Sequence, residues 1–153
     1  MRKAPPDTCG HHSRRVWLPN PPTGATALFG ARHLGHLVGV PQTVLIVDDH
    51  AGFRQAARAL LEADGFDVIG ESANGTDGIA DANRLRPDVV LLDMCLPDVD
   101  GIEVAGRLKG GPLVVLTSSS DATDYPPHFE NCGARGFIAK AELSGSALAA
   151  LAA

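Results

Sequence analysis

Five polar residues in this sequence each follow a short apolar run, and their types suit metal binding and phosphoryl transfer. They are Asp48 and Asp49 after 43–47, Asp93 after 89–92, Thr117 after 113–116, and Lys140 after 136–139. Carboxylates held close together repel one another unless a cation intervenes, and Mg²⁺ takes one or two carboxylates while keeping several waters. A remaining carboxylate could attack phosphorus and form an acyl phosphate, with the lysine and the hydroxyl stabilising the phosphoryl oxygens.

Asp93 is the preferred nucleophile of this set. It stands alone after its apolar run, whereas Asp48 and Asp49 form a pair that can hold the metal ion. By itself, Asp93 is better explained as a polar residue that ends a strand or caps the next helix. Because four apolar runs end in such residues, capping alone does not explain the set.

The apolar runs predict strands that are buried on both faces. Val89–Leu92 and Val44–Val47 are consecutive aliphatic residues with no polar alternation, which is typical of parallel strands covered by helices. A further short strand is predicted at 66–70. Apolar residues at helical spacing predict the helices, and they are Phe53, Ala57, Leu60 and Leu61; Ile79, Ala82 and Leu85; Ile102, Ala105 and Leu108; and Leu143, Ala147, Leu148 and Leu151.

Five alternations of strand and helix predict a flavodoxin-like (βα)5 three-layer α/β sandwich with a parallel sheet of order 2-1-3-4-5. In that order the first and third strands are neighbours, which brings Asp48, Asp49 and Asp93 together. They would lie at the carboxyl edge of the sheet, where open α/β sheets bind ligands. Pro126-Pro127 interrupts any helix that follows Ser118, so we expect the fourth helix to be short or irregular.

The composition limits the classes of partner and compartment. The 153 residues include 13 Lys and Arg against 18 Asp and Glu, a net charge of −5, which argues against direct binding to nucleic acid. Cys9, Cys95 and Cys132 form no CxxC pair, and their odd number favours thiols in a reducing compartment. No apolar run is long enough to span a membrane. We therefore expect a soluble, cytoplasmic protein.

Residues 1–41 differ in composition from the rest of the chain. They hold Pro5-Pro6, Pro21-Pro22 and four of the six histidines, and no helical or strand period persists through them. We interpret them as a disordered extension, or as the result of a mis-assigned translation start. Their cysteine and histidines fit no zinc spacing, and the prolines argue against a transit peptide. The folded domain is then predicted at 42–153.

Several motifs of this sequence resemble those of the receiver domains of two-component response regulators. The motifs are Val44-Leu45-Ile46-Val47-Asp48-Asp49-His50, Pro87-Asp88-Val89-Val90-Leu91-Leu92-Asp93, Leu96-Pro97-x-x-Asp100-Gly101, Val115-Leu116-Thr117-Ser118 and Gly136-Phe137-Ile138-Ala139-Lys140. Each motif is weak by itself, but together they follow the family's order over residues 43–153. The His50 signature resembles the receiver part of the LuxR/NarL-type regulators.

The resemblance implies a role for each residue of the site. Asp93 matches the phosphoacceptor that takes a phosphoryl group from a histidine kinase. The other matches are Asp49 as a direct Mg²⁺ ligand, Asp48 as its acidic companion acting largely through water, the main-chain carbonyl of Cys95 as the third protein ligand, Thr117 as the switch hydroxyl, Lys140 as the family's lysine, and Phe137 as the aromatic switch position. His50 is interpreted as a loop or helix-cap residue.

The resemblance also implies how such a domain signals. It catalyses only its own Mg²⁺-dependent phosphorylation and dephosphorylation, and it is not otherwise an enzyme. Phosphorylation changes the face formed by the fourth helix, the strand 136–139 and the last helix, which implies a downstream protein partner and leaves a homodimer through this face open. LuxR/NarL-type relatives often continue into a helix-turn-helix. The sequence ends at Ala153, so we expect no output domain and no direct DNA binding.

Two other functions remain alternatives. A phosphohydrolase with an aspartate nucleophile usually carries a second acid two residues later, where this chain has Cys95. A pseudo-receiver would bind partners without being phosphorylated. The complete set of acids, Thr117 and Lys140 argues against a pseudo-receiver, although Pro126-Pro127 alters part of the usual output face.

Overall fold

The apolar runs of the sequence form a parallel sheet in the computed structural model, which describes residues 40–119 and 131–153. The strands of the described residues are β1 (Thr43–Val47), β2 (Asp67–Ser72), β3 (Val89–Asp93), β4 (Leu113–Ser118) and β5 (Gly136–Ala139). Their order in the sheet is β2-β1-β3-β4-β5, and every pairing is parallel. The predicted flavodoxin-like strand order is therefore confirmed.

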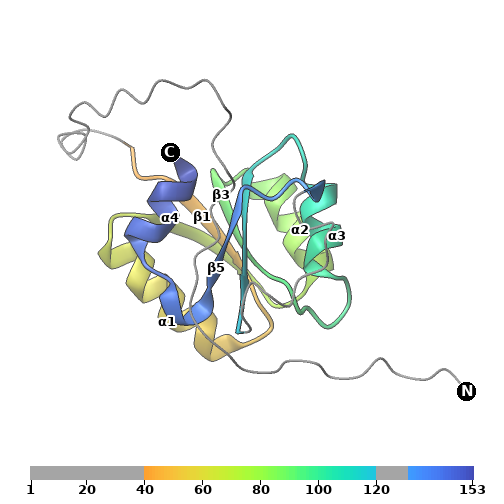
Figure 1. The fold of residues 1–153 in the computed structure, drawn as a ribbon, viewed down its shortest axis with the longest axis horizontal. Coiled ribbons are helices and arrows are strands. Elements are labelled where there is room, and N and C mark those ends of the chain that lie inside the picture. The colour runs from red at the N-terminus through yellow and green to blue at the C-terminus, as the bar shows by residue number, and fades with distance from the viewer. Residues whose placement is uncertain (1–39, 120–130) are drawn as a thin grey trace, which may run out of the picture.

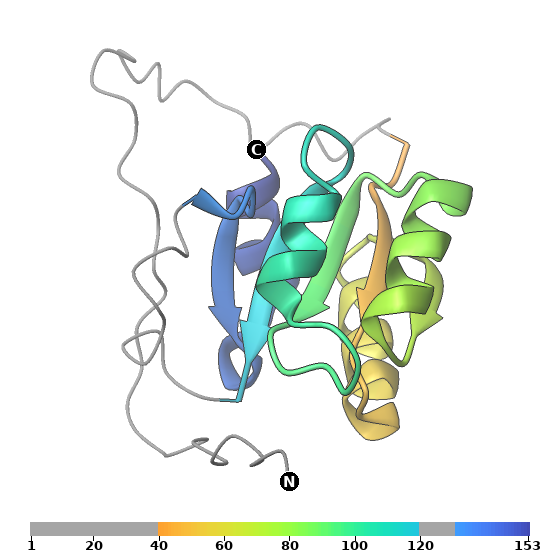
Figure 2. The ribbon, with the colours of Figure 1, turned by 90° about the vertical axis from the view of Figure 1, so that its right-hand side faces the viewer.

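Helices cover both faces of this sheet. In the described residues they are α1 (Ala51–Ala63), α2 (Gly75–Leu85), α3 (Gly101–Arg107), α4 (Gly145–Ala152) and the 3-10 turn η3 (Lys140–Glu142). Figures 1 and 2 show α1 and α4 on one face and α2 and α3 on the other. No helix of the described residues is long and apolar enough to cross a membrane.

Alternate residues of each strand supply the two layers of the core. In β1, Val44 and Ile46 belong to an apolar cluster with Leu61 of α1 and Leu148 of α4. The intervening residues of β1 belong to a second cluster, which contains Val104 and Ala105 of α3. Because both faces of β1 are buried, every position from Val44 to Val47 has to be apolar, which explains this uninterrupted aliphatic run.

Local capping interactions set the helix ends nearest the candidate site. The side chain of Asn74 accepts a hydrogen bond of 2.8 Å from the backbone N–H of Asp77 at the start of α2. At the start of α3 the side chain of Asp100 accepts one of 2.7 Å from the N–H of Ile102. Such caps satisfy backbone donors that the first turn leaves without a partner.

Two predicted boundaries were wrong. The second strand was expected at 66–70 but runs over Asp67–Ser72, because its pairing with β1 continues to the end of β1 and shifts register on the way. Leu143 was expected on the last helix, but it is buried ahead of the helix. The helix begins only at Gly145, after Ser144, whose hydroxyl accepts a hydrogen bond from the N–H of Ala147. The predictions for residues 1–39 and for the Pro126-Pro127 helix concern residues outside the described ranges.

Candidate functional site

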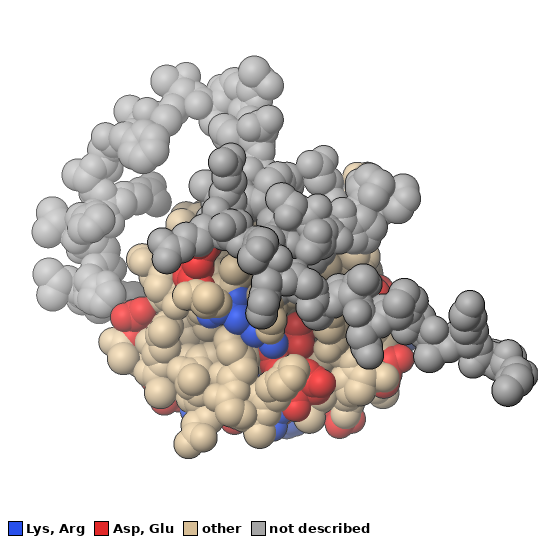
Figure 3. Space-filling model, turned by 60° about the horizontal axis from the view of Figure 1, so that its bottom comes forward, with Lys and Arg blue, Asp and Glu red and all other residues tan. Residues whose placement is uncertain are grey.

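The predicted site residues meet at the carboxyl ends of the parallel strands. Asp93 is the last residue of β3, and its partner in the register of β4 is Thr117. Asp48 and Asp49 directly follow β1, and Lys140 directly follows β5. Figure 3 turns this end of the molecule toward the viewer, and acidic and basic side chains lie together there. The sheet therefore brings residues from four strands to one edge.

Lys140 links two buried carboxylates. Its Nζ lies 2.6 Å from Oδ2 of Asp48 and 3.3 Å from Oδ2 of Asp93. The two carboxylate side chains are 1% and 3% exposed, and the lysine side chain is 11% exposed. The longer contact has hydrogen-bond geometry. The shorter contact, to Oδ2 of Asp48, does not count as a hydrogen bond and is an ion pair only. The ammonium group therefore balances part of the charge of both acids.

The environment of Asp93 favours its neutral form. Burial raises the pKa of this carboxyl above its ordinary value, and the nearby charge of Asp48 raises it further. The ammonium of Lys140 and a hydrogen bond from the N–H of Cys95 to Oδ1, at 3.2 Å, lower the pKa but do not outweigh burial. A cation added beside Asp93 would therefore favour the ionised carboxylate that can act as a nucleophile.

Asp48, Asp49, His50 and Asp93 each offer one ligand atom to a common point, and these atoms all lie within 4.8 Å of one another. His50 is the N-cap residue of α1, as predicted, and its Nδ1 lies 2.9 Å from Oδ1 of Asp49. The backbone N–H of His50 donates to Oδ1 of Asp48 at 2.8 Å, while Oδ2 of Asp48 is buried and accepts no hydrogen bond in the described part of the chain. A cluster of carboxylate oxygens, whose charge Lys140 offsets only in part, fits a hard divalent cation such as Mg²⁺.

The hydroxyl of Thr117 is buried and has no hydrogen-bond partner among the described residues. Thr117 pairs with Asp93 across β3 and β4, so the two side chains lie on the same side of the sheet. A buried hydroxyl without a partner costs about 1–3 kcal/mol in stability. This arrangement is what a hydroxyl that bonds to an added group near Asp93 would require.

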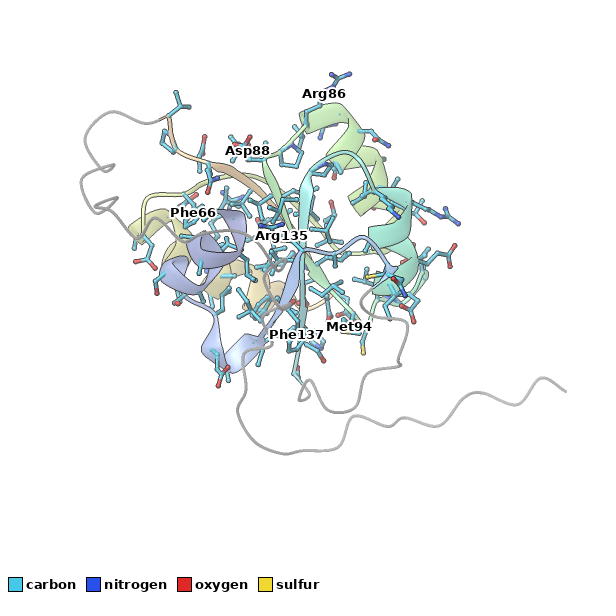
Figure 4. The ribbon with its side chains drawn as sticks, turned by 45° about the horizontal axis from the view of Figure 1, so that its top comes forward. Phe66, Arg86, Asp88, Met94, Arg135 and Phe137 are labelled. Atoms are coloured by element: carbon cyan, nitrogen blue, oxygen red, sulfur yellow. The ribbon has the colours of Figure 1, made fainter. Side chains whose placement is uncertain are left out.

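Phe137 and Cys95 differ in their exposure. Phe137 is fully buried in the apolar cluster beneath α2 and α3, together with Met94, and Figure 4 labels both residues. Cys95 is an exposed residue of the loop after β3. The backbone of that loop is close to Asp93, because the N–H of Cys95 donates to the Asp93 carboxylate.

Two residues of the first turn of α1 also belong to this site, and sequence reasoning missed both. Nη1 of Arg54 donates to the main-chain carbonyl of Asp48 at 2.6 Å. The ring of Phe53 lies 4.6 Å from Nζ of Lys140, measured to its centroid. The helical spacing marked Phe53 only as a core residue, and no pattern marked Arg54. Their closeness in sequence to Asp48-Asp49 is the signal that was available.

Asp98 was predicted only as a loop residue, but it ties the loop after β3 to the start of α2. Its carboxylate accepts hydrogen bonds from the N–H of Gly75 at 2.7 Å, and from the N–H and hydroxyl of Thr76 at 2.9 and 2.6 Å. These bonds, chiefly the one from the Thr76 hydroxyl, hold the pKa of Asp98 well below its ordinary value. Gly101 packs against the same loop, since a Cβ there would lie 2.5 Å from the carbonyl oxygen of Asp93.

Comparison with known proteins gives a consistent family. The family model described as "Response regulator receiver domain" matches residues 44–152. Among solved structures, the receiver domain of the response regulator NarL from Mycobacterium tuberculosis is 30% identical with a TM-score of 0.63, covering 74% of this chain and 98% of that chain. A LuxR-family response regulator from Aurantimonas is 26% identical with a TM-score of 0.65, covering 74% of this chain and 86% of that chain.

Two curated relatives are regulators by their names. The virulence-factor transcription regulator BvgA of Bordetella pertussis is 45% identical over 106 residues, which cover 65% of this chain and 49% of BvgA. The DNA-binding response regulator MtrA of Mycobacterium tuberculosis is 39% identical over 104 residues, which cover 65% of this chain and 44% of MtrA. The chain spans about half the length of these relatives.

Proposed function

The chain belongs to the family of response regulator receiver domains of two-component systems, and we propose that Asp93 is the residue on which it accepts a phosphoryl group. The observation that carries the proposal is the surroundings of Asp93. It is a buried carboxylate at the end of the central strand, 3.3 Å from the ammonium of Lys140. Its partner in register is Thr117, whose hydroxyl has no hydrogen-bond partner within residues 40–119 and 131–153.

The proposed reaction is a transfer from a phosphohistidine of a kinase to Asp93. A carboxylate oxygen of Asp93 attacks phosphorus and forms a C–O–P acyl phosphate. The P–N bond to the histidine breaks, and its electron pair stays on the imidazole nitrogen. Lys140 offsets negative charge on the phosphoryl oxygens, and Thr117 donates a hydrogen bond to one of them. Receiver domains are not enzymes in the usual sense, since the residue that reacts is their own.

Asp48, Asp49 and Asp93 would hold Mg²⁺, with the main-chain carbonyl of Cys95 as a further ligand. Their fit rests on the clustered carboxylate oxygens, whose negative charge the ammonium of Lys140 offsets only in part. A bound Mg²⁺ would supply positive charge that screens the acids from one another and attracts phosphoryl oxygens.

Phosphorylation would act as a switch through Thr117 and Phe137. The acyl phosphate adds charge and acceptor oxygens beside the Thr117 hydroxyl. A hydrogen bond formed there would pull Thr117, and with it the end of β4, toward the phosphoryl group. Phe137 lies on β5, next to β4, with its register partner Leu116 directly before Thr117. A shift of Thr117 can therefore alter the packing of Phe137, and with it the surface of β5 and α4 offered to a partner.

Receiver domains interact with histidine kinases, and the kinase is the first partner of this chain. A downstream protein and a homodimer through the face around β5 and α4 remain proposals, as do the cytoplasmic location and the extent of the receiver domain, residues 42–153. The DNA binding in the name of MtrA belongs to that protein. Absence of direct DNA binding by this chain therefore stays a prediction, supported by its net charge of −5.

The experiment is intact-mass analysis of the full chain incubated with acetyl phosphate, with Mg²⁺ or with EDTA. We expect the mass of one phosphoryl group to be added in the presence of Mg²⁺ only. Asp93→Asn should abolish the addition. Asp67→Asn is the matched control. Asp67 is an exposed carboxylate at the amino ends of the strands, where it pairs with Thr43, and so lies at the other end of the sheet from Asp93. This control should be phosphorylated like the wild type.

Equal phosphorylation of Asp93→Asn and the wild type would refute the assignment of Asp93. If the folded wild type takes up no phosphoryl group under any condition, the phosphorylation-independent pseudo-receiver becomes the better account. Rapid loss of the phosphoryl group with continuous release of inorganic phosphate would favour the hydrolase instead.

A further inference from the structure

The ring of Phe53 lies against the ammonium group of Lys140, with 4.6 Å between Nζ and the ring centroid. Phe53 is the third residue of α1, the helix that begins two residues after Asp49. One junction between β1 and α1 therefore supplies both the paired acids and an aromatic ring. The lysine comes from the far end of the sequence, directly after β5.

The ring and the acids surround the ammonium group together. Nζ of Lys140 lies 2.6 Å from Asp48 Oδ2 and 3.3 Å from Asp93 Oδ2, and only 11% of the side chain is exposed. A cation within about 6 Å of a ring centroid is attracted by the ring quadrupole, more strongly where water is excluded. Unlike a carboxylate, the ring takes up no proton and does not compete for a divalent metal ion.

Core packing accounts for an apolar residue at position 53 but does not require an aromatic one. Phe53 is partly buried and packs against the apolar cluster between the sheet and the helices α1 and α4. A leucine would fill that place with similar burial, as Leu61 and Leu148 do in the same cluster. A leucine has no quadrupole and would not attract the ammonium. The two explanations therefore predict different results for an aliphatic substitution.

We propose that Phe53 is a positioning residue for phosphoryl transfer, which holds the ammonium of Lys140 between Asp48 and Asp93. The inference rests on the proposed function of Asp93. Phe53 acts through Lys140, whose long side chain has four rotatable carbon–carbon bonds and many rotamers to choose from. Without the ring, the side chain of Lys140 populates more rotamers. The ammonium is then less often placed where a phosphoryl oxygen would meet it.

The contact itself can be tested without phosphorylation. The chain has three lysines, Lys3, Lys109 and Lys140, so lysine labelled with ¹³C at Cε gives a simple NMR spectrum. Lys140→Arg identifies the signal of Lys140. We expect the Hε protons of Lys140 to be shifted upfield by the ring current in the wild type and to move toward the exposed lysine signals in Phe53→Leu.

The consequence is tested by the rate of phosphorylation of the full chain with acetyl phosphate and Mg²⁺. We expect Phe53→Leu to slow the reaction about three- to tenfold, and Phe53→Trp to restore most of the rate. Phe66→Leu is the matched control, because Phe66 packs against the same apolar cluster but lies just before β2, at the opposite edge of the sheet. It should keep the wild-type rate.

A fluorination series separates the quadrupole from the shape of the ring. Phenylalanines with one, two and three ring fluorines, introduced only at position 53, keep the apolar ring while weakening its attraction for a cation. The rate should fall stepwise along the series. A merely structural role would leave the rate unchanged.

The possible failures are distinguishable. Absence of phosphorylation in the wild type would overturn the proposed function and, with it, a role for Phe53 in the reaction. Normal wild-type phosphorylation with equal rates for Phe53→Leu and Phe66→Leu, or a flat fluorination series, would overturn the role of Phe53 alone. An unshifted Lys140 signal in the wild type would overturn the contact on which the inference is built.

Discussion

Replacing Lys140 with methionine should lower the free energy of unfolding by about 3 kcal/mol at pH 7 without divalent cations. The ammonium of Lys140 is the cation placed between the buried carboxylates of Asp48 and Asp93. Methionine keeps most of the apolar stem but not the charge. Two buried acids are then left facing each other, with less compensation for their lost hydration.

The magnitude follows from the two distances. At an effective dielectric constant of about 20, opposite unit charges 2.6 and 3.3 Å apart attract by about 5–6 kcal/mol each. The cost of desolvating the charges offsets much of this attraction, and removal of one partner of a buried pair costs about 3–5 kcal/mol. We take the lower end, because the lysine side chain is 11% exposed and Asp93 can relieve the repulsion by binding a proton.

The pH dependence has a definite sign. Burial raises the pKa of Asp93, and the charge of Lys140 is the largest opposing influence, so the variant raises that pKa further. A carboxyl whose pKa is higher in the folded state binds its proton at higher pH when folded. The stability gained from this tighter proton binding is complete below the pKa of the carboxyl in the unfolded chain. It is lost as the pH rises through the pKa of the carboxyl in the folded chain. The variant should therefore regain stability as the pH falls from 7 toward 5.

Urea unfolding in EDTA at several pH values measures the loss of unfolding free energy in Lys140→Met. Lys109→Met is the control for loss of a positive charge at an exposed position. The control should stay close to the wild type at every pH. Equal losses in the two variants, or a loss for Lys140→Met that does not change with pH, would refute the proposed charge balance.

Three further substitutions test single contacts by urea unfolding of the full chain. Thr117→Val should leave stability unchanged or raise it by about 1 kcal/mol, because the buried hydroxyl has no partner among the described residues; a clear loss would mean that the hydroxyl is already bonded. Asp98→Asn should destabilise at pH 7. Because the pKa of Asp98 is lowered in the folded chain, the ionised carboxylate stabilises the fold above the pKa of the unfolded chain, and this stability is lost as the pH falls. The difference in unfolding free energy between the variant and the wild type should therefore narrow in acid. A difference that does not change with pH would contradict this role of Asp98. Gly101→Ala should cost about 1–3 kcal/mol, since its Cβ would lie 2.5 Å from the carbonyl oxygen of Asp93. Gly52→Ala, with nothing within 4 Å of the new Cβ, is its control and should cost nothing.

The parts of the fold that sequence reasoning predicted well are those in which burial dictates composition. The runs Val44–Val47 of β1, Val89–Leu92 of β3 and Leu113–Leu116 of β4 are covered on both faces, so they are aliphatic and visible without a structure. Because parallel strands end at a common edge, the residue after each run was enough to predict that Asp93, Thr117 and Lys140 meet there. The edge strand β2 has exposed positions and no such run, and its bounds were misjudged.

The contacts that sequence reasoning missed join residues whose local patterns carry no sign of each other. The carboxylate of Asp98 accepts hydrogen bonds from Gly75 and Thr76, which lie more than twenty positions earlier in the chain. A Pro-Asp pair in a loop predicts a turn equally well with or without these bonds. Phe53 meets Lys140 only because α1 begins and β5 ends at the same edge of the sheet, although β1 and β5 are not neighbouring strands. An apolar residue at helical spacing predicts core packing first.

The balance of charge at the sheet edge explains why a cation belongs in the proposed mechanism. Asp48, Asp49 and Asp93 bring three carboxylates together, and the ammonium of Lys140 contacts two of them. With all three ionised, the acids outnumber this ammonium, so the edge tends to repel a phosphoryl donor, whose oxygens are also negative. A divalent cation cancels this excess, which leads us to expect that it binds before the donor. Phosphorylation measured against donor concentration should then show tighter donor binding as Mg²⁺ rises, and donor affinity that does not depend on Mg²⁺ would contradict this order.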